Sequence, residues 1–306
     1  MKVLVTGAGG HVGGAVARAL LAEGYAVTGM SRRGAADIPP EVAPLTFDLA
    51  EGNLDTLTGG GTRCDAIVHA AACLDPADEA ALMAVNAYGT HLMAQLASRW
   101  NCTHFVYIST VAVYGKPGSS PLHERQCPAP PSLYAATKLF GEHRAALLEP
   151  QMHTLSLRIP SPIGPGLRAR RIMRVFVERA LRDEPLRVHG HGGRRQNYLD
   201  VRDVAAAVCA GIRADCSGVV QVGSAEAVSN MNLAQRITSV LGSRAEVALS
   251  GQPDPDDHVN WEMDCARARQ WLGWQPHYML EDSIRDLAAE IRRESGAAGP
   301  RTGGQL

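Results

Sequence analysis

The stretch VLVTGAGGHVGGAV (residues 3–16) places glycines three residues apart between an apolar, β-branched run and a helical pattern. Glycine permits a tight turn and a close approach of the backbone to a pyrophosphate, and the start of the following helix supplies amide donors and a positive dipole. The spacing is G-x-x-G-x-x-G, which differs from the G-x-G-x-x-G of the simplest dinucleotide fingerprint. The predicted dinucleotide-binding turn consists of Gly7, Gly10, His11, Val12 and Gly13.

Short apolar runs alternate with helical patterns through the first half of the chain. The runs are KVLVT (2–6), AVTGM (26–30), AIVHA (66–70), HFVYIS (104–109) and TLSLRI (154–159). Such runs are typical of strands buried on both faces of a parallel sheet. Between them, leucines and small residues over 82–96 repeat at the 3-4-3-4 spacing of a helix face. The alternation predicts an α/β fold, a doubly wound parallel sheet of the Rossmann type.

The composition changes after about residue 160, where the proline- and glycine-rich IPSPIGPG is followed by basic and amphipathic helical patterns. Proline and glycine at this density mark turns and loops, so a second lobe is expected to begin here. The predicted units are a dinucleotide-binding domain over 1–160, a mainly substrate-binding lobe over 161–295, a strand near 217–224 that returns to the main sheet, and a disordered tail over 296–306.

Composition excludes several other classes of protein. A formal charge of −1 gives no general attraction to nucleic acid or to an anionic membrane. No run approaches the roughly 18 apolar residues of a membrane span, and the first strand begins at Lys2, which leaves no room for a signal peptide. The seven cysteines have neither zinc-site nor disulfide-framework spacing. We expect a cytoplasmic protein that acts on a small molecule, without a metal, nucleic acid or membrane partner.

The end of the second strand bears on cofactor choice. An NAD-preferring site places an acidic residue there, against the ribose 2′-hydroxyl, whereas this chain has Ser31, followed by Arg32 and Arg33. Without a carboxylate a 2′-phosphate is not repelled, and a guanidinium can bind it through two parallel hydrogen bonds. We therefore expect NADP. NAD is the alternative, in which the two arginines are simply solvated.

A tyrosine and a lysine lie four residues apart in SLYAATKLFGEHRAALL (132–148), whose helical periodicity places Tyr134 and Lys138 on one face. An ammonium beside the phenol would lower the pKa of Tyr134 from its usual value near 10. Tyr134 could then exchange a proton with a substrate hydroxyl or carbonyl while a nicotinamide exchanges hydride. Upstream, a predicted strand ends in Ser109 and Thr110, whose hydroxyls are expected at the same substrate oxygen.

The order of motifs resembles the extended short-chain dehydrogenase/reductases, the family of nucleotide-sugar epimerases, dehydratases and ketoreductases. The matching segments are TGAGGHVG, FDL (47–49), HAAA (69–72), NAYGT (86–90), STVAVYG (109–115), YAATK (134–138), LRIPSPIGPG (157–166), YLDVRDVA (198–205) and LGWQP (272–276). The resemblance spans nearly the whole chain. It implies that Tyr134 is the acid/base, that Lys138 binds the nicotinamide ribose and tunes Tyr134, that Thr110 is the hydroxyl partner, and that the protein is a homodimer.

The resemblance also implies further cofactor contacts. Those at the adenine are Asp48 and Leu49, and those along the cofactor cleft are His69, Ala70 and Ala71. Asn86 is expected at the cofactor site as well, with the alternative that its amide only ties its helix to a neighbouring strand.

Departures from the family pattern narrow the function. Dehydratases carry an Asp-Glu pair directly after the catalytic threonine, whereas Val111 and Ala112 follow Thr110 here, and neither can move a proton. A 4,6-dehydratase is therefore not expected.

The substrate lobe departs as well. Where epimerases commonly hold the substrate diphosphate with an asparagine and two arginines, this chain has Ser161, Gln196 and Gln252. A neutral glutamine cannot replace a guanidinium at a phosphate, so Arg194 and Arg195, which adjoin Gln196, are expected to compensate. A second basic cluster follows at Arg168, Arg170, Arg171 and Arg174, which is otherwise a solvated helix face. Either these shifted arginines bind the diphosphate, or the substrate is not a nucleotide sugar.

The leading hypothesis is an NADP-dependent ketoreductase of the 4-ketoreductase type. NADPH would deliver hydride to a carbonyl of a sugar-like, nucleotide-linked substrate while Tyr134 supplies the proton. The alternatives are an NAD-dependent nucleotide-sugar epimerase that works by transient oxidation, a reductase of a non-nucleotide small molecule, and a non-catalytic cofactor-sensing protein on the same fold. The same tyrosine, lysine and threonine suit reductase and epimerase, so the catalytic motif does not separate these two.

Overall fold

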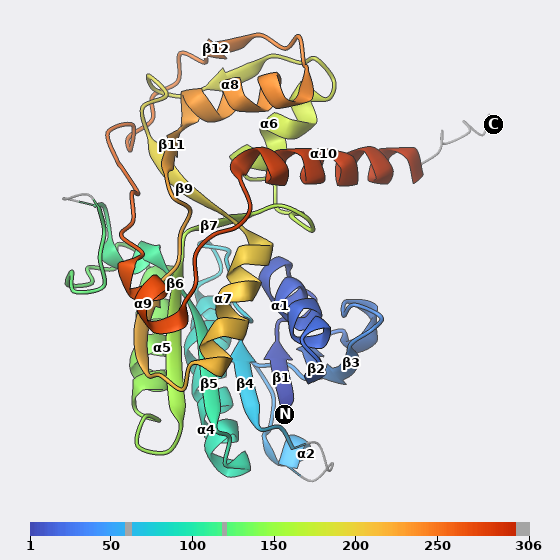
Figure 1. Cartoon of the computed structure of the whole chain (residues 1–306), viewed down its shortest axis with the longest axis vertical. Helices are drawn as coiled ribbons and strands as arrows, with labels where there is room; N and C mark the ends of the chain where they lie inside the picture. Colours follow the sequence, from blue (N-terminus) through green and yellow to red (C-terminus); the bar gives the residue numbers. More distant parts are fainter. Residues whose placement is uncertain (59–62, 118–120, 298–306) are drawn as a thin grey trace.

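The main layer of the protein is a seven-stranded parallel sheet (Figure 1). The computed structural model describes residues 1–58, 63–117 and 121–297. In spatial order the strands are β10 (Gly218–Gln221), β6 (His153–Ile159), β5 (His104–Thr110), β4 (Ala66–His69), β1 (Lys2–Thr6), β2 (Ala26–Ser31) and β3 (Ala43–Thr46). The five predicted runs form β1, β2, β4, β5 and β6, which confirms the doubly wound α/β fold.

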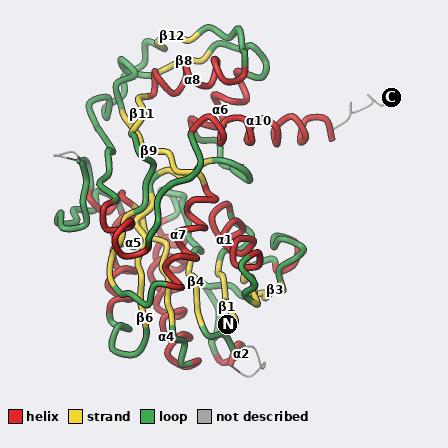
Figure 2. Tube along the Cα trace, in the orientation of Figure 1, coloured by secondary structure: helices red, strands yellow, loops and turns green. Residues whose placement is uncertain are grey.

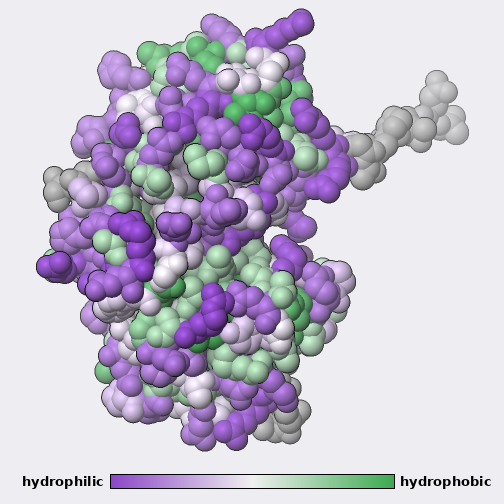
Figure 3. Space-filling model, viewed as in Figure 1, coloured by the Kyte–Doolittle hydropathy of each residue, from purple (hydrophilic) through white to green (hydrophobic). Residues whose placement is uncertain are grey.

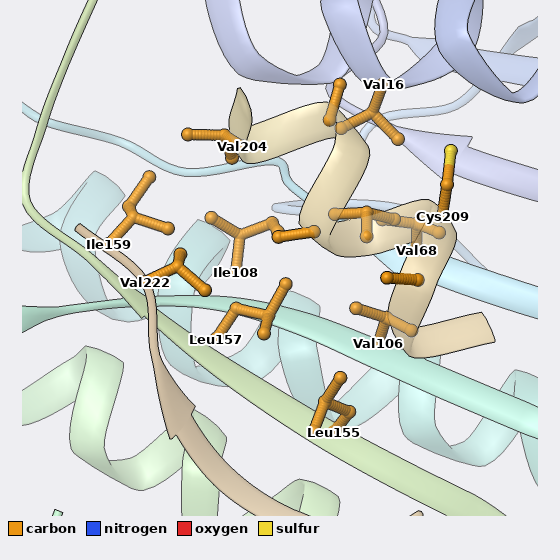
Figure 4. Packing of buried hydrophobic residues seen from close by; sticks show 14 of the residues in the cluster. Val16, Val68, Val106, Ile108, Leu155, Leu157, Ile159, Val204, Cys209 and Val222 are labelled. Atoms are coloured by element: carbon orange, nitrogen blue, oxygen red, sulfur yellow. The ribbon is translucent and has the colours of Figure 1, made fainter. Parts of the chain in front are cut away.

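Helices cover both faces of this sheet because neighbouring residues of a strand point to opposite sides. The flanking helices are α1 (His11–Ala22) and α7 (Val201–Arg213) on one face, and α4 (Gly89–Trp100) and α5 (Leu133–Ala146) on the other. Val3 and Val5 belong to the apolar cluster with α1 and α7, whereas Leu4 belongs to the cluster with α4. Figure 4 shows the first cluster, in which Val16 and Val204 pack over the strands.

A smaller lobe lies beyond the carboxyl ends of the main strands (Figure 1). Its strands form the orders β11-β9-β7 and β12-β8, and its helices α6, α8 and α10 enclose a third apolar cluster. The bounds are β7 (Ser161–Ile163), β8 (Leu186–Val188), β9 (Arg195–Asp200), β11 (Ala227–Ser229), β12 (Val247–Leu249), α6 (Ile172–Ala180), α8 (Asn230–Leu241) and α10 (Leu280–Ala297). Figure 2 shows the helices of both lobes in red and their strands in yellow.

The shorter elements connect these layers. They are η1 (Gly34–Ala36), α2 (Asp55–Thr58), α3 (Glu79–Ala81), the π-helix η2 (Leu82–Tyr88), η3 (Val111–Tyr114) and α9 (Ala266–Leu272). Helix α10 extends to Ala297, so the predicted tail from 296 onward overlaps its last turn, and residues 298–306 lie outside the described residues. Within the described ranges no helix is long and apolar enough to cross a membrane. Hydrophilic residues cover most of the face in Figure 3.

Helix α5 lies directly against β5, and a glycine makes this contact possible. A Cβ on Gly141 would lie 2.2 Å from both Cζ and the hydroxyl oxygen of Tyr107, which is fully buried. Atoms this close overlap, so no larger residue fits without movement of the helix or the tyrosine. The position of α5 on the sheet therefore depends on the absence of a side chain at residue 141.

Replacing Gly141 with alanine is expected to lower the free energy of unfolding by about 1–3 kcal/mol, because the overlap outweighs the roughly 1 kcal/mol that alanine gains over glycine in a helix. Urea unfolding measures the change. The control is Ala136→Ser on the exposed face of the same helix, which is expected to stay within about 0.5 kcal/mol of the parent. Equal stability of the Gly141→Ala protein and the parent would contradict the packing argument.

Candidate functional site

The glycine-rich turn joins β1 to α1, and two of its glycines have no room for a side chain. Gly7 has φ +67°, and a Cβ there would lie 2.8 Å from Cα of Ala71. A Cβ on Gly13 would lie 2.2 Å from the carbonyl oxygen of Gly7. At Gly10 a Cβ would meet, among the described residues, only that same oxygen, at 3.2 Å. The start of α1 is thus close to the turn and open to a ligand, which suits a dinucleotide pyrophosphate.

The two residues between these glycines have different surroundings. Val12 packs against the apolar cluster between the sheet and α1, while His11 approaches Gly166 of the smaller lobe, where a Cβ would lie 3.6 Å from its ring. Burial lowers the pKa of His11 to about 4, against the opposing effect of a hydrogen bond to the backbone of Pro165. The side chain of His11 is therefore neutral at pH 7 and joins the two lobes.

An acidic residue that the sequence analysis did not consider lies beside the glycine-rich turn. Asp37 binds Arg33 through two contacts, Nε to Oδ2 at 2.7 Å and Nη2 to Oδ1 at 2.6 Å. A Cβ on Gly9 would lie 2.6 Å from Cβ of Asp37, so the two residues are in close contact. Ser31 donates a hydrogen bond to the carbonyl of Gly34. Asp37 therefore already binds the Arg33 guanidinium, and a contact of Arg33 with a 2′-phosphate stays a prediction.

Asp48 and Leu49 follow β3, and their side chains have structural contacts. Asp48 accepts a hydrogen bond from the amide of Ala50 at 2.8 Å, and Leu49 is buried with its Cβ 2.9 Å from the position of a Cβ on Gly89. Leu49 thus packs under the start of α4, and only Asp48 retains partial exposure.

His69 is fully buried at the end of β4, with both ring nitrogens in hydrogen bonds. Nδ1 lies 2.7 Å from the Thr6 hydroxyl and Nε2 lies 3.0 Å from the Thr90 hydroxyl. Because Thr90 donates its proton to the carbonyl of Asn86, we assign the proton of the imidazole to Nε2. Burial, together with the charge of Lys138, lowers the pKa of His69 to about 3. The His69 ring is fully buried between Thr6 and Thr90, and the backbone of Ala71 lies against Gly7.

Asn86 lies in the π-helix η2 and ties it to the segment after β4. Its amide accepts from the Cys73 amide at 2.7 Å, donates to the Cys73 carbonyl at 3.0 Å, and donates to the Thr137 hydroxyl at 3.3 Å. A π-helical turn inserts an extra residue into a helix and is frequent at functional sites. These contacts match the alternative given for Asn86, in which its amide ties its helix to a neighbouring strand. The hydrogen bond to Thr137 also ties the π-helix to α5.

Thr110 and Tyr134 meet at the carboxyl end of β5. Thr110 ends the strand and caps η3, and its hydroxyl interacts with the phenol of Tyr134 near the start of α5. Burial raises the pKa of Tyr134 above its ordinary value, while the charge of Arg171 and the Thr110 hydroxyl act in the opposite direction. Arg171, which precedes α6, is therefore the cation that acts on the phenol.

Lys138 is buried one turn further along α5. Its Nζ lies 4.3 Å from the centre of the Tyr107 ring. Burial lowers the pKa of Lys138 to about 7, while the negative charge of Glu142 raises it. That Lys138 lowers the pKa of Tyr134 stays a prediction; the structure places its ammonium over the ring of Tyr107, with the charge of Glu142 acting on it.

Ser109 also differs from expectation. It is buried, and its hydroxyl donates to Oε1 of Glu142 at 2.5 Å. Because side chains alternate along a strand, Ser109 points to the opposite side of β5 from Thr110. A contact of Ser109 with substrate is not supported.

The predicted diphosphate-binding residues lie in the smaller lobe with partners of their own. Arg194 lies 3.6 Å from Asp256 and 3.8 Å from Asp254. Arg195 donates to the carbonyl of Ala227, and Gln196 donates to Asn230 at 3.5 Å. Ser161 is half-buried in β7, and Gln252 lies in the loop after β12. Their role at a substrate diphosphate stays a prediction.

The second basic cluster divides into a structural member and exposed ones. Arg174 is buried and binds the Leu167 carbonyl, Glu178 and Glu294. Arg168, Arg170 and Arg171 are exposed, and of these Arg171 acts on the catalytic tyrosine. The functional residues that sequence reasoning missed are Asp37, Glu142 and the specific role of Arg171. Asp37 and Glu142 each had a local signal, a four-residue spacing from Arg33 and from Lys138, whereas Arg171 had none.

Comparison with known proteins shows the family of this chain. Residues 3–223 match the NAD dependent epimerase/dehydratase family. The chain belongs to this family. It is thus an NAD(P)-dependent enzyme of the extended short-chain dehydrogenase/reductase type, which confirms the resemblance found in the sequence.

Relatives within the family carry out several reactions. The chain is 27% identical to a dTDP-glucose 4,6-dehydratase of Streptomyces niveus, covering 93% of this chain and 90% of that protein. It is also 27% identical to a UDP-glucose 4-epimerase of Mycolicibacterium smegmatis, covering 96% and 100%. A crystal structure of UDP-glucose 4-epimerase with UDP-glucose from Thermotoga maritima superposes with a TM-score of 0.88 at 21% identity, covering 96% of this chain and 100% of that one. At 21% identity, the similarity to the Thermotoga maritima structure shows a shared fold.

The lowered pKa of His69 predicts an acid-sensitive fold for this family member. An unfolded histidine binds a proton below its ordinary pKa of 6.5, whereas buried His69 binds one only near pH 3, so stability is complete above pH 6.5 and falls as the pH drops toward 3. Between pH 7 and 4.5 we expect the His69→Gln protein to lose about 2–3 kcal/mol less unfolding free energy than the parent. Urea titrations at both pH values measure this.

The matched control for this experiment is His123→Gln, at an exposed histidine, which is expected to lose as much stability as the parent. Equal losses in the His69→Gln and parent proteins would show that His69 is not held neutral by the fold.

Proposed function

We propose that the protein is a nucleotide-sugar epimerase that uses NAD to oxidise one carbinol carbon of its substrate and to reduce it again on the other face. The observation that carries this proposal is the phenol of Tyr134 beside Thr110, followed by the apolar pair Val111 and Ala112. This arrangement supplies a single proton-transferring group, which hydride transfer needs, and lacks the additional acid and base that elimination of water needs. Because a UDP-glucose 4-epimerase and a dTDP-glucose 4,6-dehydratase are both 27% identical to this chain, the choice against dehydration rests on these residues.

The residues of this chain have distinct tasks in such a reaction. A bound dinucleotide would supply the hydride acceptor and donor. Tyr134 and Thr110 would hydrogen-bond the substrate oxygen, and the phenol would exchange its proton. Because burial raises the pKa of Tyr134, the phenol is neutral without cofactor and is ready to donate a proton to a ketone. Removal of a proton from a hydroxyl needs additional positive charge, which Arg171 supplies in part and which Lys138 would supply once drawn toward the nicotinamide ribose.

The choice of NAD over NADP rests on the pairing of Arg33 with Asp37. A guanidinium that already binds a carboxylate through two hydrogen bonds is not available for a 2′-phosphate, and Asp37 brings negative charge to the turn beside Gly9. Of the two arginines that follow β2, this leaves Arg32 to bind a 2′-phosphate. Solved relatives that hold NAD, such as the UDP-glucose 4-epimerase of Thermus thermophilus, support the same direction. The NADPH-dependent 4-ketoreductase is the competing proposal, and it depends on Arg32.

The substrate proposed here carries a nucleoside diphosphate. The charge of Arg194 is offset by Asp254 and Asp256, so it is poorly suited to hold a diphosphate. Exposed Arg168, Arg170 and Arg171 lie in the segment that leads into α6, near Tyr134, and offer cations without a carboxylate among their described contacts. We infer that these residues replace the family's usual arginines at the diphosphate.

Activity without added cofactor tests the function. The purified protein is expected to interconvert UDP-glucose and UDP-galactose, or another pair of 4-epimers, and to release NAD on denaturation. Tyr134→Phe should lower kcat about 10²–10⁴-fold while NAD is retained, because the phenol is the acid/base. Tyr88→Phe, at an exposed tyrosine, is the matched control and should keep the parent rate. Turnover of a keto sugar only with added NADPH, without retained NAD, would favour the ketoreductase instead.

Asp37 tests the cofactor choice by itself. Asp37→Asn should free the Arg33 guanidinium and strengthen NADP binding about tenfold relative to NAD, the value of one charge-assisted hydrogen bond. Calorimetric titration of the nucleotide-free protein with both dinucleotides measures the ratio. In the Asp37→Asn background, Arg33→Met should remove the gain. Preference of the parent protein for NADP would contradict this account of Arg33.

A further inference from the structure

A buried cluster of charged residues lies beneath the catalytic helix. Glu142 belongs to α5, and Arg158 belongs to β6; their side chains are 5% and 4% exposed. Arg158 donates to Glu142 twice, from Nε to Oε1 at 2.9 Å and from Nη2 to Oε2 at 2.7 Å. Ser109 of β5 donates to Oε1 as well, at 2.5 Å. Two strands of the sheet therefore hold one carboxylate of the helix that carries Tyr134 and Lys138.

The carboxylate lies one helical turn after Lys138, on the same face of α5. Three titratable groups face Lys138: Glu142 from α5, Tyr107 from β5 and His69 from β4. Burial keeps Tyr107 and His69 uncharged, because it raises the pKa of the phenol and lowers the pKa of the imidazole. Among the described groups that act on Lys138, Glu142 is thus the anion.

The Glu142 carboxylate has one acceptor position that is not used by Arg158 or Ser109. A carboxylate offers about four acceptor positions, and Arg158 and Ser109 occupy three of them. The Arg158 guanidinium also stacks on the ring of Tyr114, 4.7 Å from its centre, which partly compensates the positive charge from the other side. Without Glu142, two cations would be buried together without an anion. Lysine, unlike arginine, would then lose its proton.

We propose that Glu142 is a positioning residue for catalysis: held by Arg158 and Ser109, its carboxylate fixes α5 on the sheet and keeps Lys138 an ammonium ion. An uncharged Lys138 would neither add positive charge near Tyr134 nor donate three hydrogen bonds to a ribose. The inference rests on the proposed function only in its assignment of Lys138 to the reaction.

The charge of Lys138 can be measured directly because the chain has only three lysines, Lys2, Lys116 and Lys138. The full-length protein is labelled with [6-¹³C]lysine, and the three Cε signals are followed by NMR over pH 5 to 11. Lys2→Arg and Lys116→Arg variants assign them. In the parent, the Lys138 signal is expected to titrate near pH 7.

In the Glu142→Gln protein, the midpoint of the Lys138 signal should fall by about one pH unit or more, because a nearby opposite charge has been removed while shape is kept. Ser109→Ala retains the carboxylate and removes one hydrogen bond, so its Lys138 midpoint should stay near that of the parent. A folded Glu142→Gln protein with the parent midpoint would overturn the proposal, and so would an equal fall in Ser109→Ala.

The single variant leaves Arg158 unpaired and buried, which can prevent folding. Glu142→Gln combined with Arg158→Met removes both charges and is compared with Arg158→Met alone, which keeps the carboxylate; an equal Lys138 midpoint in these two proteins overturns the proposal. The readout is made on the protein without substrate. Absence of epimerase activity in the parent would therefore count against the proposed function and leave the outcome for Glu142 intact.

Discussion

Two helices lie so close to the main sheet that only glycine fits where they touch it. Gly13 brings α1 onto the carbonyl of Gly7, and Gly141 brings α5 onto the ring of Tyr107. In a parallel sheet the carboxyl ends of all strands share one edge, so these two contacts place the open start of α1 and the catalytic helix at the same edge. The smaller lobe covers this edge, with His11 against Gly166 and Arg171 acting on Tyr134.

Burial then decides the charge of the groups that meet there. It raises the pKa of Tyr134, lowers that of Lys138 to about 7 and lowers that of His69 to about 3. In each case the low-dielectric surroundings disfavour the charged form. The charges that oppose this trend are Arg171, from the segment before α6, for the phenol and Glu142, from α5 itself, for the ammonium. Tyr134 thus depends on a partner from the smaller lobe, whereas the anion beside Lys138 lies on its own helix and is held there by Arg158 and Ser109 of the neighbouring strands.

Several arginines that were expected to bind phosphate already have partners within the protein. Arg33, Arg174 and Arg194 all have carboxylate partners, and Arg195 is bound to a backbone carbonyl. A guanidinium bound in this way contributes to the fold and has little left for a phosphate. The arginines that remain exposed after Gly166 are therefore the ones that bear on the proposed substrate, and Arg32 is the one that bears on cofactor choice.

The sequence by itself determined the parallel sheet, the glycine-rich turn, the four-residue spacing of Tyr134 and Lys138 and the family. These features depend on residue periodicity and on backbone geometry within one turn or strand, which neighbouring residues specify. Tertiary structure decided that Ser109 turns to Glu142 and that Lys138 faces Tyr107. Ser109, Glu142 and Arg158 are 33 and 16 residues apart in the chain. These residues become partners because α5 packs on β5 and β6. Hydrogen bonds between separate elements produce no periodic pattern in the sequence, so the sequence alone does not predict them.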